Sequence, residues 1–365
     1  MSVRAAVMTA PEKPVELWDI DDPVLEPGSV LLETLASEVC GTDVHLHKGR
    51  LAGVPYPIIP GHMSVGRIIE MRGVDTDATG AALQSGDLVT FYDVHEVCNA
   101  CYHCTVAQQP NRCRSRRVYG ITYSAHDGLL GGWAERIYLK PGVRTVRLPE
   151  WLDPDYLIGG GCGLFTGFGA IERSDLAMGD TVVVQGSGPV GISAAGFAVL
   201  RGAGRVIVIG APDARLSLVQ EFGADDVLSL ENESIEARKA FVLDATDGRG
   251  ADVVIEACGN PSAISEAFGL LRDGGTYVIA GHYTDTGTVE INPHLDINQK
   301  HIDVRGQWGT EFRHVVRSLN VLTKHHERLP FHRVIGKRYG LADTNAALAD
   351  VAALRVSKAI VDPSC

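Results

Sequence analysis

Cysteine is the residue type with the most evident chemistry in this sequence, and four of its eight cysteines fall within one short segment. They follow the pattern Cys98-x2-Cys101-x2-Cys104-x8-Cys113. Four thiolates at such spacings close a tetrahedron around Zn²⁺ and leave no open position for catalysis. Because the N-terminal stretch lacks the apolar run of a secretory signal, the clustering favours metal binding over disulfides. We expect a structural zinc lobe at about residues 95–115, with an iron–sulfur cluster or reduced free thiols as alternatives.

A second set of metal-ligand types is dispersed along the chain: Cys40, His62 and Cys162, each beside a glycine. Two thiolates and an imidazole make a three-ligand zinc shell with a fourth position open to an alcohol or carbonyl oxygen. Taken singly, a buried cysteine or histidine is more often a core residue or a local hydrogen-bond partner. The stretch Cys40-Gly41-Thr42-Asp43-Val44-His45 adds a hydroxyl, a carboxylate and an imidazole, which are the parts of a metal-activated proton path.

The loop Gly186-Ser187-Gly188-Pro189-Val190-Gly191 lies between an apolar strand, 181–185, and an alanine-rich helix, 192–201. A GxGxxG pattern in this context predicts a dinucleotide-binding turn. The first glycine permits the tight turn, the second admits the pyrophosphate, and the third lets helix and strand pack closely. The helix N-terminus then faces the phosphates. The alternative is a glycine-rich turn in another α/β fold.

The residues that follow the second apolar strand bear on the choice of coenzyme. An NAD site normally carries Asp or Glu about 20 residues after the glycine loop, to bind the ribose 2′-hydroxyl. Gly210 occupies that position, which removes repulsion against the 2′-phosphate of NADP. No basic residue stands at 211 or 212, and Asp213 is nearby. Arg215 is a candidate ribose or phosphate contact, or else a solvated helix charge, so NAD and NADP both stay open.

The pattern of apolar and polar residues changes twice along the chain. Its first ~150 residues alternate apolar and polar positions between turns, which predicts strands. From 181 to 280, apolar strands alternate with amphipathic helices, which marks a doubly wound parallel sheet. Mixed texture returns near 307, with a helix expected at 311–324. The predicted fold class is α/β: a coenzyme domain (164–306) inserted into a β-rich catalytic domain (1–163 and 307–365).

Composition narrows the class of protein. The 365 residues are 45% hydrophobic and 21% charged, which is ordinary for a globular enzyme. A net charge of −12 without a basic stripe argues against nucleic acid or anionic lipid as a partner. No apolar run reaches the ~18 residues of a membrane span, so the expected location is the cytoplasm.

Together these motifs resemble the zinc-dependent alcohol dehydrogenases of the medium-chain dehydrogenase/reductase superfamily, over nearly the whole chain. The resemblance adds three patterns to those above: Gly61-His62-x3-Gly66, Gly131-Gly132-x-Ala134-Glu135 and Gly161-Cys162-Gly163-x2-Thr166-Gly167. It implies a GroES-like catalytic domain, a Rossmann coenzyme domain and a homodimer or homotetramer. It also implies two zinc ions per chain: a catalytic one on Cys40, His62 and Cys162, and a structural one on the four clustered cysteines.

The resemblance further assigns roles around the catalytic zinc. Thr42 is expected to contact the substrate hydroxyl, and His45 to receive the proton through the nicotinamide ribose of NAD(H) or NADP(H). Asp43 would orient His62 as carboxylates do at zinc sites. Thr166 is expected against the nicotinamide and Lys358 on the pyrophosphate.

Three positions depart from the family pattern. Met63 replaces the glutamate that usually follows Gly-His, and a thioether supplies no charge behind the metal. The last gap of the zinc lobe is one residue longer than usual, which a loop tolerates at little cost. The third departure is Gly210.

The predicted reaction is hydride transfer between the nicotinamide and an alcohol/ketone pair, with a bulky or cyclic secondary alcohol favoured by aromatic residues in the segments that line the family's cleft. The candidates are Leu46, Tyr56, Tyr92, His95, Trp133, Phe165 and Trp308. A polyol or sugar alcohol is the alternative, since His47, Asp93 and Gln307 offer further hydrogen bonds. Rival classes are a zinc-free quinone or enone reductase and a non-catalytic coenzyme-binding protein on the same fold.

Overall fold

The computed structural model describes residues 2–365, and the chain forms two compact units. The first unit comprises the residues up to Gly161 together with Glu311–Leu319 and Ile335–Cys365. The second comprises Cys162–Thr310 and Asn320–Val334.

The second unit includes Asn320–Val334, which the predicted domains placed in the catalytic part. It also runs from Cys162 to Thr310, where the prediction gave 164–306. Phe331 packs edge-on against Phe222, with ring centroids 4.9 Å apart, and Arg333 forms an ion pair with Glu221. These contacts attach the segment to the coenzyme-type unit. Its sequence texture alone carried no sign of them.

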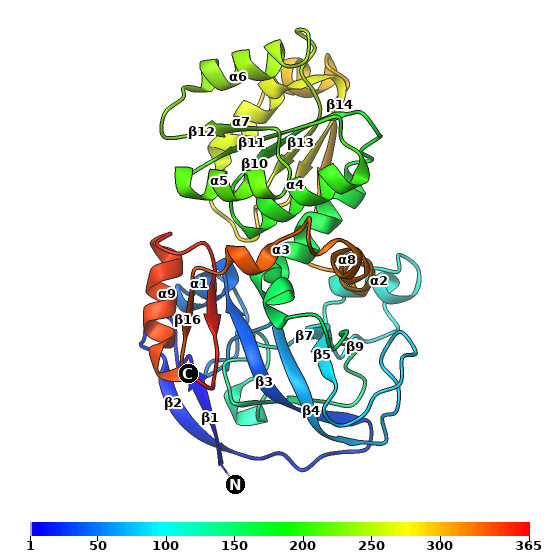
Figure 1. The fold of residues 1–365 in the computed structure, drawn as a ribbon, viewed down its shortest axis with the longest axis vertical. Coiled ribbons are helices and arrows are strands. Elements are labelled where there is room, and N and C mark those ends of the chain that lie inside the picture. The colour runs from blue at the N-terminus through cyan, green and yellow to red at the C-terminus, as the bar shows by residue number, and fades with distance from the viewer. Residues whose placement is uncertain (1) are drawn as a thin grey trace. The chain divides into compact units, whose positions relative to one another are not determined.

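The first unit is built on a seven-stranded sheet whose central strand is β3 (Figure 1). The order is β16-β17-β3-β4-β5-β9, and β8 also pairs with β3. The strands of this sheet are β3 (Ser29–Val39), β4 (Ser64–Arg72), β5 (Leu88–Phe91), β8 (Arg136–Leu139), β9 (Thr145–Arg147), β16 (Lys337–Tyr339) and β17 (Ala359–Val361). Two short sheets pair β1 (Ser2–Val7) with β2 (Glu16–Asp21) and β6 (Val94–His95) with β7 (Arg117–Val118).

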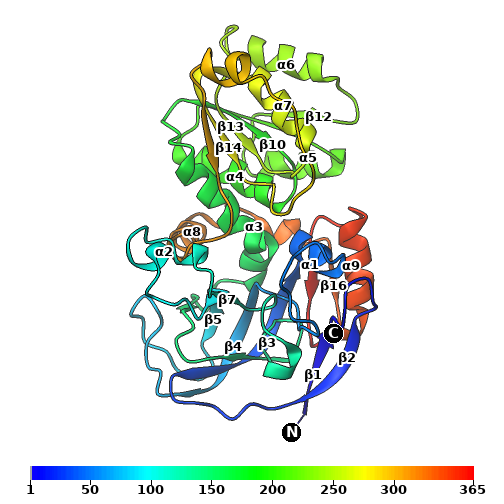
Figure 2. The ribbon, with the colours of Figure 1, turned by 180° about the vertical axis from the view of Figure 1, so that it is seen from behind.

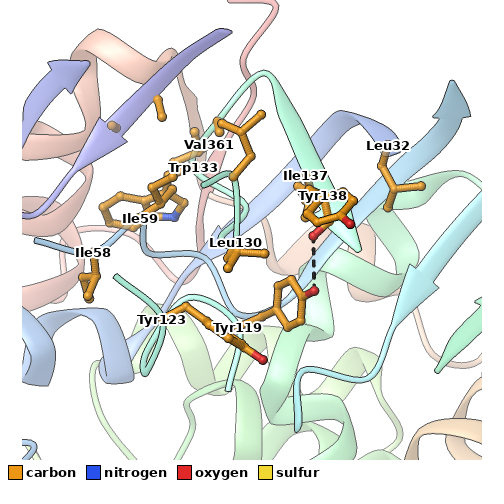
Figure 3. Packing of buried hydrophobic residues seen from close by; sticks show 14 of the residues in the cluster. Leu32, Ile58, Ile59, Tyr119, Tyr123, Leu130, Trp133, Ile137, Tyr138 and Val361 are labelled. Carbon is orange, nitrogen blue, oxygen red and sulfur yellow. Dashed lines mark hydrogen bonds between the residues drawn. The ribbon is translucent and has the colours of Figure 1, made fainter. Parts of the chain in front are cut away.

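Aromatic and aliphatic side chains fill the core of the first unit (Figure 3). Trp133, Tyr119 and Ile58 have no exposed surface. The phenol of Tyr119 donates a hydrogen bond to the Tyr138 carbonyl (3.2 Å), which satisfies a buried polar group within this apolar cluster. The strands that flank the candidate site therefore rest on a tightly packed base.

The second unit is a six-stranded parallel sheet in the order β12-β11-β10-β13-β14-β15. This is the doubly wound order 3-2-1-4-5-6 of a Rossmann fold, which confirms the predicted class. Helices α4 and α5 cover one face and α6 and α7 the other (Figures 1 and 2). The strands are β10 (Thr181–Gln185), β11 (Arg205–Gly210), β12 (Asp226–Ser229), β13 (Ala251–Glu256), β14 (Leu271–Ile279) and β15 (Asp303–Gly306).

Helices connect these strands. Those of the second unit are α4 (Pro189–Arg201), α5 (Asp213–Glu221), α6 (Ile235–Asp244) and α7 (Pro261–Leu270), and those of the first are α1 (Gly41–His47), α2 (Tyr102–Thr105) and α9 (Thr344–Ala352). Helices α3 (Pro154–Arg173) and α8 (Phe312–His325) each begin in the first unit and end in the second. The predicted helix 311–324 corresponds to α8. Within residues 2–365 no helix combines the length and apolar character needed to cross a membrane.

Candidate functional site

The structure brings the three dispersed ligand candidates together, and a fourth residue joins them. Ligand atoms of Glu38, Cys40, His62 and Cys162 all lie within 4.8 Å of one another. Glu38 lies near the end of β3 and Cys40 directly follows that strand, while His62 precedes β4 and Cys162 lies in α3. Two thiolates, an imidazole and a carboxylate are donors that zinc accepts.

Helix α1 begins at Cys40 and holds the predicted proton path. The Cys40 thiolate position accepts the Thr42 amide (3.3 Å), and Asp43 Oδ2 accepts the Cys40 amide (2.8 Å). These two bonds fix the ligand cysteine as the helix cap. Thr42 and His45 stand three residues apart, so they lie on one face of the helix.

His62 is surrounded by acidic groups. Burial lowers its pKa, but Cys40, Glu38, Asp43 and Asp93 together raise the pKa to about 9. A buried imidazole surrounded by a thiol and three carboxyl groups is a candidate functional site.

The predicted contact between Asp43 and His62 is not formed as a hydrogen bond. Asp43 Oδ1 and His62 Nδ1 are both buried, and neither atom has a partner among residues 2–365. Burial raises the pKa of Asp43, and the attraction of His62 opposes that rise. The orienting role of Asp43 therefore stays a prediction.

Glu38 is the site residue that sequence reasoning missed. Its carboxylate has no exposed surface; Oε1 lies 3.4 Å from His62 Nε2, and Oε2 forms an ion pair with Lys358 Nζ. Lys358 is only 2% exposed. Its predicted contact with the coenzyme pyrophosphate stays a prediction, because the ammonium is here engaged by Glu38. The available sequence signal was an acidic residue in an otherwise buried strand, two positions before Cys40.

The four cysteines expected to form a zinc lobe make up the second cluster of candidate metal ligands. Cys98 Sγ lies 4.0 Å and Cys101 Sγ 3.6 Å from Cys104 Sγ. A tetrahedron with Zn–S bonds of about 2.3 Å has edges of about 3.8 Å, so these separations fit zinc. Backbone amides of Cys98 and Cys101 point at Cys113 and Cys98 sulfurs, at 3.4 and 3.3 Å, which stabilises thiolates.

The glycine loop has the geometry predicted for its three glycines. Gly186 has a φ of +131°, which favours glycine. A Cβ on Gly188 would meet nothing within 4 Å, which leaves the backbone open to a ligand. A Cβ on Gly191 would lie closer than 3.0 Å to the Gly186 carbonyl, so only glycine permits this packing of loop and helix. Pro189 and Val190 begin α4, and Gly188 is its N-cap.

The residues at the end of β11 leave little space beside Gly210, and Asp213 accepts hydrogen bonds from neighbouring side chains. A Cβ on Gly210 would lie 2.6 Å from Ser187 Oγ, so the family's acidic side chain has no space there. Asp213 accepts hydrogen bonds from Ser229 (2.5 Å) and Asn232 (2.9 Å). Arg215 is partly buried, and burial lowers the pKa of its guanidinium. These contacts leave the coenzyme choice open.

Several residues proposed to line a substrate cleft are core residues instead. Leu46 and Trp133 are fully buried in the first unit's core, and the Trp133 indole donates to the Glu38 carbonyl (3.0 Å). His95 is buried and bonds Tyr123 (2.7 Å) and the Pro141 carbonyl (3.0 Å). Packing within this core explains their burial, since apolar and aromatic side chains serve cores as readily as clefts.

Trp308 and Thr166 lie in the second unit. Trp308 stacks on Tyr283, with ring centroids 5.5 Å apart. Thr166 Oγ1 donates to the Cys162 carbonyl (3.0 Å), which places it one helical turn after that ligand. Its contact with a nicotinamide stays a prediction.

Comparison with known proteins identifies the family. The alcohol dehydrogenase GroES-like domain model matches residues 26–150, and the zinc-binding dehydrogenase model matches 189–323. The 5-exo-hydroxycamphor dehydrogenase of Pseudomonas putida is 32% identical over 363 residues, covering 98% of each chain. The chain belongs to the zinc-dependent alcohol dehydrogenases of the medium-chain dehydrogenase/reductase superfamily.

Two further relatives of the chain have names that point to different substrates. The L-threonine 3-dehydrogenase of Pyrococcus horikoshii is 29% identical over 295 residues, covering 79% of this chain and 78% of its own. The solved structure of an alcohol dehydrogenase from Thermotoga maritima superposes with a TM-score of 0.94 at 32% identity, covering 99% of each chain. The family and fold are thus shown, while the relatives' substrates differ.

Proposed function

We propose that this dehydrogenase oxidises a bulky or cyclic secondary alcohol to its ketone, and reduces the ketone in reverse, with zinc and a nicotinamide coenzyme. The single observation that carries the proposal is the cluster of Cys40, His62 and Cys162 ligand atoms within 4.8 Å. A structural ion has no need of a neighbouring hydroxyl and imidazole on one helix face, whereas alcohol oxidation needs a proton path. Zinc bound there supplies Lewis-acid polarisation of the substrate oxygen.

Residues of α1 carry the proton away from the substrate hydroxyl. Thr42 binds the substrate hydroxyl and passes its proton toward His45. Burial lowers the pKa of His45, and Lys48 and Arg50 lower it further. The imidazole is therefore neutral near pH 7 and able to accept a proton, which suits alcohol oxidation.

The coenzyme binds on the glycine loop. Gly188 presents an open backbone to the pyrophosphate, and the N-terminus of α4 favours its negative charge. Arg215 is the candidate contact for the ribose side. NAD(H) and NADP(H) are both candidates, since Gly210 neither repels nor attracts a 2′-phosphate.

A cyclic secondary alcohol is favoured by the hydroxycamphor dehydrogenase relative, which matches along 98% of both chains. A polyol is the alternative that the sequence offers. An amino alcohol such as L-threonine is a further candidate, favoured by L-threonine 3-dehydrogenase relatives of lower identity, of which the one from Streptomyces avermitilis is 28% identical and covers 99% of both chains. We also propose a cytoplasmic homodimer or homotetramer with two zinc ions per chain.

A panel of substrates tests the proposal directly. Bicyclic and monocyclic secondary alcohols, ethanol, sorbitol and L-threonine are each offered with NAD and with NADP, and reduced nicotinamide is followed by absorbance. The proposal expects the largest kcat/KM for a cyclic secondary alcohol with one coenzyme. If kcat/KM were largest for sorbitol or L-threonine, that compound's class would replace the cyclic secondary alcohol as the proposed substrate. No turnover with any alcohol or ketone would reject the dehydrogenase role.

A further inference from the structure

Met63 lies next to a buried carboxylate on the neighbouring strand. Family members carry a glutamate after Gly-His, close behind the catalytic metal, and Met63 offers no charge there. Strands β3 and β4 are antiparallel, with Ser37 opposite Ser64. The next residue of β3 is Glu38, whose amide donates to the Met63 carbonyl (3.1 Å). A carboxylate therefore stands on the adjacent strand, beside the position that lost one.

We infer that Glu38 is a fourth protein ligand of the catalytic zinc through Oε1, held in place by Lys358, and that it takes the part of the glutamate missing at Met63. The inference rests on the proposed function, because it assumes that zinc binds Cys40, His62 and Cys162.

The distance between Glu38 Oε1 and His62 Nε2 supports direct ligation. It is 3.4 Å. Tetrahedral zinc with Zn–N and Zn–O bonds of about 2.1 Å separates nitrogen from oxygen by about 3.4 Å. The two atoms are thus already spaced as neighbouring ligands of one ion. A hydrogen-bonded pair would stand nearer, at about 2.7–3.2 Å.

Lys358 holds the other oxygen of the same carboxylate. It directly precedes β17, where Ile360 pairs with Glu38 on β3, so its place is fixed by the sheet. Lys358 and Glu38 are 2% and 0% exposed. The ammonium engages Oε2, and Oε1 lies 3.4 Å from His62 Nε2, beside the ligand cluster. If a substrate oxygen displaced this carboxylate from a bound zinc, the ion pair with Lys358 would keep the carboxylate beside the site.

The backbone around the pair is shaped to fit it. Gly161 has φ +54° and ψ −144°, a kink within α3 immediately before Cys162. A Cβ at Gly161 would lie closer than 3.0 Å to both Glu38 Oε2 and Lys358 Nζ. The Trp133 indole fixes the Glu38 carbonyl at 3.0 Å. Lys358 and the kinked backbone of α3 thus confine the carboxylate, while Trp133 holds the backbone of Glu38.

Zinc affinity is the test, because it does not depend on turnover. Wild type, Glu38→Gln and Glu33→Gln are titrated with a chromophoric chelator, and bound zinc is counted by elemental analysis. Glu33 is an exposed carboxylate on the same strand, so it is the matched control. Cys40→Ser marks the behaviour of protein without a catalytic zinc. We expect Glu38→Gln to weaken one of the two zinc ions by about 10- to 100-fold, the range seen for lost supporting groups at metal sites, and Glu33→Gln to change neither.

A relocation variant guards against misfolding as the explanation. Glu38→Met combined with Met63→Glu returns the carboxylate to the family position and should restore zinc affinity to within about 3-fold of wild type. Cobalt substitution gives a second readout, since losing an oxygen ligand alters the visible d–d bands. Wild-type zinc affinity in folded Glu38→Gln, or no recovery in the relocation variant, overturns the inference. A wild type that binds one zinc or none overturns the proposed function instead, so the two failures are distinguishable.

Discussion

Gly161→Ala should damage the candidate metal site through the backbone and the Glu38–Lys358 pair, without replacing any candidate ligand. Gly161 sits at φ +54° and ψ −144°, a region reserved for glycine that costs other residues about 1–3 kcal/mol. The new Cβ would also fall within 3.0 Å of Glu38 and Lys358. Separating a buried ion pair costs about 3–5 kcal/mol. The two effects sum to about 4–8 kcal/mol of lost unfolding free energy.

Gly80→Ala is the matched control. Gly80 has φ +89°, but a Cβ there meets nothing within 4 Å, so only the backbone cost of about 1–2 kcal/mol applies. The assay is thermal and urea unfolding of both variants, with zinc counted in each folded sample. At about 2–4 °C per kcal/mol, Gly161→Ala should lower Tm by at least about 8 °C and at least twice as far as the control. It should also lose one zinc. Equal shifts in the two variants, with both zinc ions retained, would refute the reasoning.

Three further predictions concern the proton path and the zinc lobe. Thr42→Ala should lower kcat by roughly 100-fold or more with both zinc ions bound, while Thr42→Ser recovers turnover; near-normal turnover in the alanine variant would remove Thr42 from the path. Because the pKa of His45 is lowered from 6.5, its ring is neutral at pH 7. Alcohol oxidation should therefore fall only as the pH drops below 6.5. His45→Asn should abolish that acid limb in a pH–rate profile, and an unchanged limb would assign it elsewhere. Cys113→Ser should leave one zinc per chain, by elemental analysis, and lower Tm while turnover persists at low temperature; two zinc ions in this variant would contradict a four-cysteine site.

The parts of the fold and of the candidate site that were predicted from the sequence are those in which the relevant residues are close together along the chain. The strand 181–185, the glycine loop and the following helix are adjacent in sequence, so their geometry is local and readable. The four lobe cysteines are likewise within sixteen residues. The dispersed ligand candidates Cys40, His62 and Cys162 were noticed because each lies beside a glycine, and the fold brings their ligand atoms together.

Glu38 escaped prediction for a physical reason. Its importance depends on β3 and β4 lying antiparallel in one register, which puts it beside Met63, and on Lys358, 320 residues later in the chain. No short pattern records such a contact. The proposed lining residues Leu46 and Trp133 failed in the opposite way: their type suits a cleft, but packing buries them in the core.

Counting zinc in the purified protein tests the central claim most directly. Elemental analysis of wild type, Cys40→Ser and Cys98→Ser is combined with coenzyme reduction by a cyclic secondary alcohol. The account predicts about two zinc ions in wild type and one in each variant, with turnover lost in Cys40→Ser and retained in Cys98→Ser. Full turnover in a Cys40→Ser protein, or in wild type stripped of zinc, would contradict it.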